Sequence, residues 1–429
     1  MENPGAIENV SSNARIQGAV ATLRSTKTIR KRAQALLERA RRGESSWFTV
    51  NDGAMVTAAA LVAQLTRARY PSLIIPYHSR WRHFEAGGVD RAAQLNAALA
   101  HSSPLDKAVA QIDLVLVSVL LDAGAGADWQ YEEKHHSGSN QSNHLSRSEG
   151  LGVASFHAFM NGLFSSDSQR PLQADAQGLQ AITAKKLATA FQVTPSNPLV
   201  GLDGRAALLR RLGQALQAQP EIFGKEGEQG RPGNLLKLLT AGANTVQAHD
   251  LLSLLLTSLS TIWPGQNALE GIALGDCWRH PAAQGDGPND ASAGWMPFHK
   301  LSQWLTYSLL EPFEWAGIKV EGLDALTGLP EYRNGGLFLD AGILRLKDPQ
   351  HARQPHQAGD ELIVEWRALT VALLDELALL VREQLGVSAG QMPLACVLEG
   401  GTWAAGRALA QQLRGGQPPL HIISDGTVF

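Results

Sequence analysis

The 429-residue sequence lacks the features of several large protein classes. It has only two cysteines, Cys277 and Cys396, without a CxxC pair, which argues against a disulfide framework and a structural zinc cluster. The net charge is −3, so the basic excess of a nucleic-acid-binding protein is missing. The most apolar stretch, Leu251–Ile262, is far shorter than the ~20 residues of a membrane span. Residues 1–15 have no apolar signal-peptide segment. We therefore expect a cytoplasmic protein with neither nucleic acid nor membrane as partner.

The sequence does contain enough apolar residues for a large core, since 44% of it is hydrophobic. This content predicts one large domain, or two intimately packed ones, over residues 1–429. A soft boundary is expected near residues 195–200. Two segments rich in small and polar residues, 134–147 and 282–294, are expected to be flexible loops.

Apolar residues recur mainly at helical spacing. The longest such series predicts a helix that starts near Glu361 and contains Leu362, Trp366, Leu369, Leu373, Leu377 and Leu380. Another helix is predicted over Ala54–Arg67, with Asp52 as its cap. The basic run Arg30–Arg42 has interleaved apolar residues and is interpreted as an amphipathic helix with a solvated basic face.

Strand-like runs are few, namely Leu73–Pro76, Ile318–Val320 and Leu420–Ile423. Strands and helices do not alternate regularly, which argues against a doubly wound nucleotide-binding fold. The predicted class is therefore mainly α with a few short strands.

Common catalytic signatures are missing: the sequence has no GxxxxGK[ST], HExxH or GxSxG motif. His135, His136 and His144 could in principle hold a metal, but they lie in the polar loop and are expected to be solvent-exposed. We therefore predict no metal site.

Basic side chains cluster in the segment Ile75–Glu85, where His78, Arg80, Arg82 and His83 occupy six positions ahead of two glycines. Guanidinium groups bind phosphate and carboxylate in a bidentate manner. The segment therefore predicts either an anion pocket or a surface turn whose arginines pair with carboxylates at the edge of the core.

Two acidic positions are candidates for chemistry. Asp122 directly follows the apolar run Leu114–Leu121 and is interpreted as a ligand-facing acid or as a cap on the next turn. Glu331, Tyr332 and Arg333 lie in a turn bounded by proline and glycine, where side chains would face a cleft or form a structural ion pair. Glu365 and Arg367 flank Trp366 on the predicted long helix and are interpreted as structural.

Several ordered blocks of the sequence resemble the uracil-catabolism protein family of the fungal and bacterial URC-type pathway, long described as a domain of unknown function. The blocks are 75–88, 120–126, 155–167, 197–205, 298–317, 326–339, 398–407 and the ending Ser-Asp-Gly-Thr-Val-Phe. The resemblance implies a step after ring opening, in which a ribosyl-urea releases urea.

The C-terminal half also resembles, more distantly, the queuosine salvage proteins, which are N-glycosylases of a nucleoside 5′-monophosphate. Their Phe-Tyr-Lys-x-x-Gln, Ala-Asp-Tyr-Arg and Val-Glu-x-Arg blocks are similar to residues 298–303, 330–333 and 364–367. This resemblance implies a helical fold like that of DNA glycosylases. Glu331 stands where those proteins carry Asp, so the position of the carboxylate differs.

Together the resemblances imply an N-glycosidase without a cofactor that cleaves the ribose–nitrogen bond of a small-molecule ribosyl-urea or its 5′-phosphate. A carboxylate would stabilise an oxocarbenium-like state and orient water. Glu331 is assigned that role, with Asp122 as helper or ribose ligand. A donor to the leaving urea would be His299, Tyr332 or His83.

The remaining expected contacts are with substrate. The predicted substrate-binding residues are Tyr332, Arg333, Lys300, His78, Arg80, Arg82, His83 and Trp403, the last within the matched block 398–407. Two alternatives stay open. One is an amidohydrolase with Cys277 as nucleophile. The other is a non-catalytic scaffold or regulator of the pathway.

Overall fold

The computed structural model describes residues 4–134, 142–224, 229–263, 267–287 and 290–423, with side chains from residue 13 onward. His135, His136 and the ending 424–429 lie outside these residues. The chain divides into two compact units. Unit 1 comprises Met1–Tyr77, Gly265–Gln303 and Gly322–Ile423, and unit 2 comprises His78–Pro264, Trp304–Glu321 and Ser424–Phe429. Residues 195–200 lie within unit 2.

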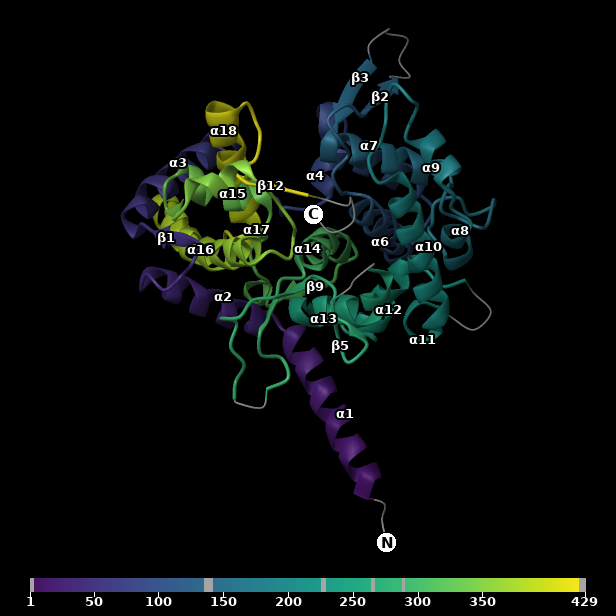
Figure 1. Cartoon of the computed structure of the whole chain (residues 1–429). Helices are drawn as coiled ribbons and strands as arrows, with labels where there is room; N and C mark the ends of the chain where they lie inside the picture. The colour runs from purple at the N-terminus through teal and green to yellow at the C-terminus, as the bar shows by residue number, and fades with distance from the viewer. Residues whose placement is uncertain (1–3, 135–141, 225–228, 264–266, 288–289, 424–429) are drawn as a thin grey trace. The chain divides into compact units, whose positions relative to one another are not determined.

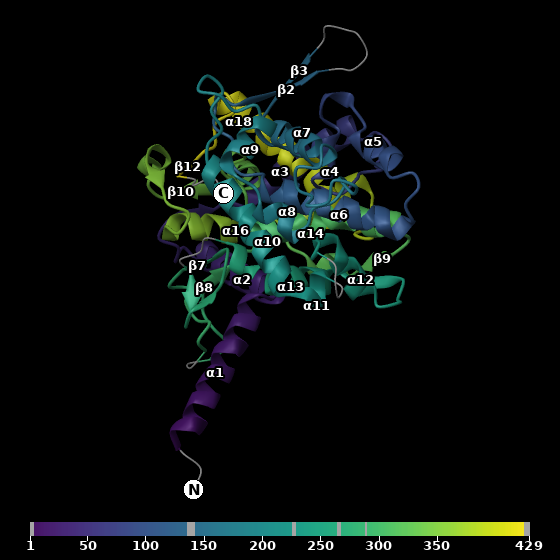
Figure 2. The same ribbon diagram turned by 90° about the vertical axis from the view of Figure 1, so that its right-hand side faces the viewer.

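Helices dominate both units, which confirms the predicted mainly α class (Figures 1 and 2). The helices of unit 1 are α1 (Pro4–Leu23), α2 (Thr26–Arg41), α3 (Met55–Arg69), α15 (Tyr332–Asp340), α16 (Glu361–Leu385), α17 (Leu394–Val397) and α18 (Trp403–Arg414). Those of unit 2 are α4 (Trp81–Phe84), α5 (Arg91–Ala98), α6 (Pro104–Leu120), α7 (Arg147–Met160), α8 (Ala176–Gln180), α9 (Ala184–Ala190), α10 (Leu202–Ala218), α11 (Pro220–Phe223), α12 (Leu235–Thr240) and α13 (Ala248–Ser258). Helix α14 (Lys300–Trp315) begins in unit 1 and continues in unit 2.

The strands are short and pair two at a time. In unit 1 the pairs are β1 (Phe48–Val50) with β10 (Leu344–Leu346), β5 (Ala268–Leu269) with β6 (Ile272–Ala273), β7 (Cys277–Arg279) with β8 (Trp295–Pro297), and β11 (Pro355–His356) with β12 (His421–Ile422). In unit 2 they are β2 (Gln130–Lys134) with β3 (Ser142–Ser146), and β4 (Thr245–Gln247) with β9 (Lys319–Glu321). Such two-stranded sheets connect neighbouring loops by hydrogen bonds and do not form a core of their own.

Helix α16 is the centre of unit 1. The predicted apolar series is buried along it except for Leu380, which is half-buried, and α2 and α3 pack on it. Helices α15 and α18 are also in close contact: a Cβ on Gly406 would lie 2.1 Å from the Arg333 carbonyl oxygen. Glycine at 406 is therefore required by the approach of the two helices.

Helix α6 has the corresponding place in unit 2, because it is buried continuously from Ala108 to Leu120. Ser103 caps its first turn, and Pro104 follows at the position where proline is favoured. Helices α7 and α10 pack against it, and the β2–β3 hairpin runs along α7. No helix among the described residues is long and apolar enough to cross a membrane.

Three local predictions are wrong. Asp52 does not cap α3, because its carboxylate receives hydrogen bonds from Arg41 and the helix begins at Met55. Leu73–Pro76 is not a strand, since no neighbouring segment pairs with its backbone in the described part of the chain. The expected loop 134–147 is wrong at its described ends, because Lys134 and Ser142–Ser146 belong to a hairpin in which Tyr131 pairs with Leu145; residues 135–141 lie outside the described residues.

The basic run is helical as predicted, but its basic face is only partly solvated. Arg32 is 4% exposed and donates hydrogen bonds to the carbonyl and hydroxyl oxygens of Ser292. Arg30 pairs with Asp375 of α16 at 2.8 Å. Charges in this run therefore attach neighbouring segments of unit 1 to α2.

Candidate functional site

A buried ion pair organises the candidate site of unit 1. The carboxylate of Asp276 accepts two hydrogen bonds from the Arg367 guanidinium, both of 2.8 Å. It also accepts hydrogen bonds from the Trp278 indole at 2.7 Å and from the Lys300 backbone N–H at 2.9 Å. Burial alone would raise the pKa of Asp276, but Arg367 and these donors hold that pKa well below its usual range. The pair therefore joins α16 to the start of α14.

Arg367 also connects this pair to the turn that precedes α15. Its Nε donates to the carbonyl oxygen of Pro330 at 3.3 Å, and its guanidinium lies 4.0 Å from the centroid of the Phe298 ring. Arg367 is 2% exposed. One buried cation therefore positions the residue directly before Glu331.

Glu331 is the N-cap of α15. Its Oε2 accepts from the backbone N–H of Arg333 at 2.7 Å, and its Oε1 accepts from that of Asn334 at 2.6 Å. The half-buried carboxylate thus satisfies two donors that the first turn of a helix leaves open. These amides and the positive end of the helix favour a negative charge there. The result is a carboxylate fixed in orientation.

The neighbours of Glu331 differ in exposure. Tyr332 is 39% exposed, whereas Arg333 is buried and donates from Nη1 to the carbonyl oxygen of Gly416 at 3.2 Å. The Arg333 guanidinium lies 4.9 Å from the centroid of the Tyr332 ring. The predicted group of Glu331, Tyr332 and Arg333 is therefore brought together at one helix start. Trp403 begins α18 and lies under the Arg407 guanidinium at 5.5 Å.

His299 has a structural environment. It is 4% exposed, has a φ of 50°, and its Nε2 lies 2.9 Å from the carbonyl oxygen of Leu23, to which it donates. Burial lowers its pKa, so the neutral ring is favoured. Its donor group is thus engaged within the protein. Lys300, the next residue, begins α14 and is partly buried.

Cys277 is unsuited to act as a nucleophile. It is fully buried in an apolar cluster with Val20, Leu23, Leu274 and Trp295. Burial, and next the Asp276 charge, raise the pKa of its thiol. Because the thiolate is the reactive form, this environment argues against the amidohydrolase alternative.

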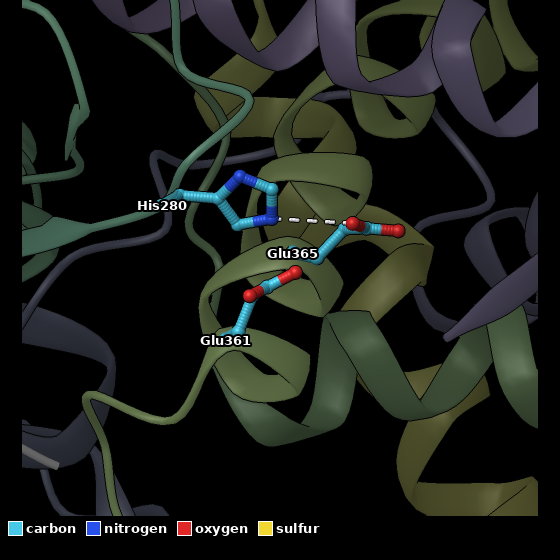
Figure 3. Close-up of side chains that lie close together, drawn as sticks. All are labelled: His280, Glu361 and Glu365. Carbon is cyan, nitrogen blue, oxygen red and sulfur yellow. Dashed lines mark hydrogen bonds and ion pairs between the residues drawn. The ribbon is translucent and has the colours of Figure 1, made fainter. Parts of the chain in front are cut away.

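A second polar group of unit 1 has the composition of a metal site. The donor atoms of His280, Glu361 and Glu365 lie within 4.8 Å of one another, and the two glutamates extend from successive turns of α16 (Figure 3). The Ala282 backbone N–H donates to His280 Nδ1 at 3.2 Å, so Nε2 carries the ring proton and donates to Glu365 at 3.2 Å. A cation would need the Nε2 lone pair that this proton occupies. The group is thus best described as a hydrogen-bond network.

The candidate site of unit 2 is centred on Arg80, whose side chain is completely buried. Its Nη1 lies 3.0 Å from the Asp122 carboxylate, its Nε donates to the Ser118 hydroxyl at 2.7 Å, and Nη1 also donates to the Ser148 carbonyl at 3.2 Å. Asp122 follows Leu121, the C-cap of α6, and α7 contributes Ser148. Two predicted site residues, Arg80 and Asp122, thus form one ion pair.

His83 and Trp304 border this pair. Their rings are 5.7 Å apart at 88°, and the Arg80 guanidinium lies 5.6 Å from the Trp304 ring centroid. Burial and the Arg80 charge lower the pKa of His83 to about 4, so its ring is neutral at physiological pH. A Cβ on Gly152 of α7 would lie 2.9 Å from the His83 Cβ and 3.5 Å from the Arg80 Nη2. Helix α7 therefore packs directly against His83 and Arg80, and glycine at 152 permits this approach.

Arg82 does not share this environment. It pairs with Glu311 at 2.6 Å and with Glu85 at 2.7 Å, which is the structural alternative offered for the basic segment. Burial raises the pKa of Glu311 to about 7 although Arg82 opposes the shift. His78 lies close enough to His83 for its charge to lower the pKa of that ring.

The sequence identified most of the candidate site residues but not the neighbouring residues that contact and position them. Asp276 and Trp278 lie in no recognised motif, and an acid beside a buried cysteine in Gly-Asp-Cys-Trp was the available signal. Gly152 and Trp304 were also missed as site residues, because an isolated glycine or a helical tryptophan is ordinary in a core. Glu331 belongs to unit 1 and Asp122 to unit 2.

Comparison with known proteins matches nearly the whole chain. A family model described as "Protein of unknown function (DUF1688)" matches residues 22–429. Protein urg3 of Schizosaccharomyces pombe is 39% identical over 421 residues, covering 96% of this chain and 99% of that protein. Uracil catabolism protein 4 of Lachancea kluyveri is 38% identical over 384 residues, covering 83% of this chain and 85% of that protein.

Proposed function

Because the chain belongs to the DUF1688 family, which its sequence matches from residue 22 to residue 429, we propose that it acts in uracil catabolism as an N-glycosidase. The name of the Lachancea kluyveri relative, uracil catabolism protein 4, supports the pathway. The reaction is hydrolysis of the ribose–nitrogen bond of a ribosyl-urea or its 5′-phosphate. Water adds its oxygen to the anomeric carbon, and the leaving urea nitrogen gains a proton.

The observation that supports this reaction best is the fixed Glu331 carboxylate. Two backbone amides of α15 orient it, and the Arg367–Asp276 pair holds the preceding turn. Cleavage of a glycosidic bond develops positive charge at the anomeric carbon, and a carboxylate positioned beforehand stabilises that charge without reorganising.

The roles of the other residues are proposed from the exposure and the hydrogen-bond partners of their side chains. Tyr332 is the preferred donor to urea, because its ring is exposed beside Glu331 whereas His299 donates to Leu23. Lys300 and Arg333 are the proposed contacts to a 5′-phosphate.

The test is incubation of the purified protein with ribosyl-urea and with its 5′-phosphate, while urea and reducing sugar are measured together. Equal release of both products is expected from the wild type. Glu331→Gln should lower kcat at least 100-fold, because the charge that stabilises the oxocarbenium-like state is lost.

A matched control separates catalysis from helix capping, since Glu331→Gln also weakens an N-cap. Asp90 caps α5 in the same manner, accepting from the Ala93 backbone N–H at 2.8 Å. Asp90→Asn should cost a similar ~1 kcal/mol of stability and leave kcat unchanged. Ammonia without ribose would instead identify an amidohydrolase, and no turnover of either compound would favour a scaffold.

A further inference from the structure

The Arg80–Asp122 cluster of unit 2 contains buried hydrogen-bonding groups that the protein does not use. Among the described residues, Nη2 of Arg80, Nδ1 of His83 and Nε1 of Trp304 are buried and have no hydrogen-bond partner. Arg80 is 0% exposed and Trp304 is 5% exposed. A buried polar group without a partner costs roughly 1–3 kcal/mol, so three in contacting side chains indicate a missing polar partner.

Several groups surround the unpartnered Nη2 of Arg80. Helix α7 comes close to it, since a Cβ on Gly152 would lie 3.5 Å from Nη2, and the Ser118 hydroxyl accepts from the neighbouring Nε. Ser118 shares a hydrogen bond of 2.6 Å with Ser155, which donates to the Gly152 carbonyl at 2.8 Å. The contacts of Nε and Nη1 therefore fix the guanidinium, while Nη2 is left for a further acceptor.

The charges of the cluster decide what kind of partner fits. Arg80 is paired with Asp122, and Glu149 also acts on it electrostatically. Arg205, 1% exposed, is close enough to Asp122 and Arg80 to respond to both charges. Two cations therefore face two carboxylates, and His83 is neutral. A phosphate would bring an uncompensated charge of about −2 into a buried, already neutral group, which is strongly unfavourable.

We infer that the cluster of Arg80, His83, Asp122 and Trp304 binds the neutral hydroxyl groups of a ribose ring, and not a phosphate. Hydroxyls accept from the guanidinium and indole N–H groups and donate to the Asp122 carboxylate, so they match a set with both donors and acceptors. An aromatic ring beside polar side chains suits a sugar, which has both apolar and polar faces. The choice of ribose rests on the proposed function.

The test measures binding of two probes to the full-length protein by titration calorimetry: methyl β-ribofuranoside and inorganic phosphate. The ribofuranoside is expected to bind, and Trp304→Phe should weaken its affinity about tenfold by removing one donor. Trp304→Phe removes ring contacts with Arg80 and His83 but no hydrogen bond made by Nε1 among the described residues, so its melting temperature should fall less than that of the control. In the control Trp81→Phe, loss of the 3.1 Å hydrogen bond to the Ser308 carbonyl should lower the melting temperature and leave affinity unchanged.

Two results would overturn the inference. One is phosphate binding that weakens with Trp304→Phe, and the other is ribofuranoside binding that is undetectable or unchanged in that variant. Neither depends on turnover, so the inference and the proposed function fail separately. If ribosyl-urea is not hydrolysed while the ribofuranoside binds through Trp304, only the N-glycosidase proposal fails.

Discussion

Replacing Asp276 by Asn tests whether the buried ion pair organises unit 1. The change removes the charge opposite Arg367 and places an amide N–H₂ among four hydrogen-bond donors. Arg367 is 2% exposed, so its cation would remain buried without compensation. Removing one partner of a buried pair costs about 3–5 kcal/mol. We expect the free energy of unfolding to fall by about 3 kcal/mol, at the lower end of this range, because Arg367 keeps its hydrogen bond to the Pro330 carbonyl oxygen.

The assay is urea denaturation of both proteins at several pH values. The pKa of Asp276 is depressed in the folded protein, so its contribution is present above the ordinary unfolded pKa of ~3.9 and is lost as pH falls toward the folded value. The stability difference between wild type and Asp276→Asn should therefore be constant from about pH 7 to pH 5. It should shrink below about pH 4.

The control is Glu44→Gln, which breaks an ion pair with Arg42 whose side chains are 58% and 50% exposed. No measurable change is expected there, because solvent screens such pairs. If Asp276→Asn changed stability as little as Glu44→Gln, or if its deficit did not shrink in acid, the organising role assigned to Asp276 would be refuted.

Three other predictions use the same reasoning. Cys277→Ala should retain full kcat, because its thiol is buried with a raised pKa; loss of product formation at unchanged stability would revive the nucleophile hypothesis. Treatment with EDTA should change neither activity nor melting temperature, because the His280 Nε2 proton occupies the position a cation would need; a melting shift reversed by zinc would show otherwise. The folded pKa of Glu311 is raised to about 7, so protonated Glu311 favours the folded state. This contribution is present below the unfolded pKa and is lost as pH rises through the folded pKa of about 7. The stability advantage of wild type over Glu311→Gln should therefore narrow between pH 5 and pH 8, and a gap that widens would contradict the assigned pKa.

The sequence was informative wherever one periodic pattern decided the structure. The apolar series that starts at Leu362 predicts α16, since its period of 3.6 persists over about five turns. Asp52 was misassigned because the sequence does not show that Arg41 competes for its carboxylate. The strand predicted at Leu73–Pro76 failed for a similar reason: a strand needs a partner, and pairing is set by distant segments.

The same limit applies to the site. Glu331 was identifiable as an acid in a proline-bounded turn, but not as the cap of α15, because capping depends on where the helix begins. Asp276 and Arg367 are 91 residues apart, and no local pattern predicts that they pair. For Arg82 the sequence allowed an anion pocket or an ion pair, and only the position of Glu311 distinguishes the two.

The division of the chain into units also affects how the protein is made. Helix α2 buries its apolar face with α16, which follows it by more than 300 residues. At a synthesis rate of about 5–20 residues per second, that interval lasts roughly 15–65 s. Residues 78–264 leave the ribosome during this time and contain most of unit 2. The apolar face of α2 therefore stays exposed until α16 is synthesised. This exposure makes α2 the part of the nascent chain most in need of a chaperone.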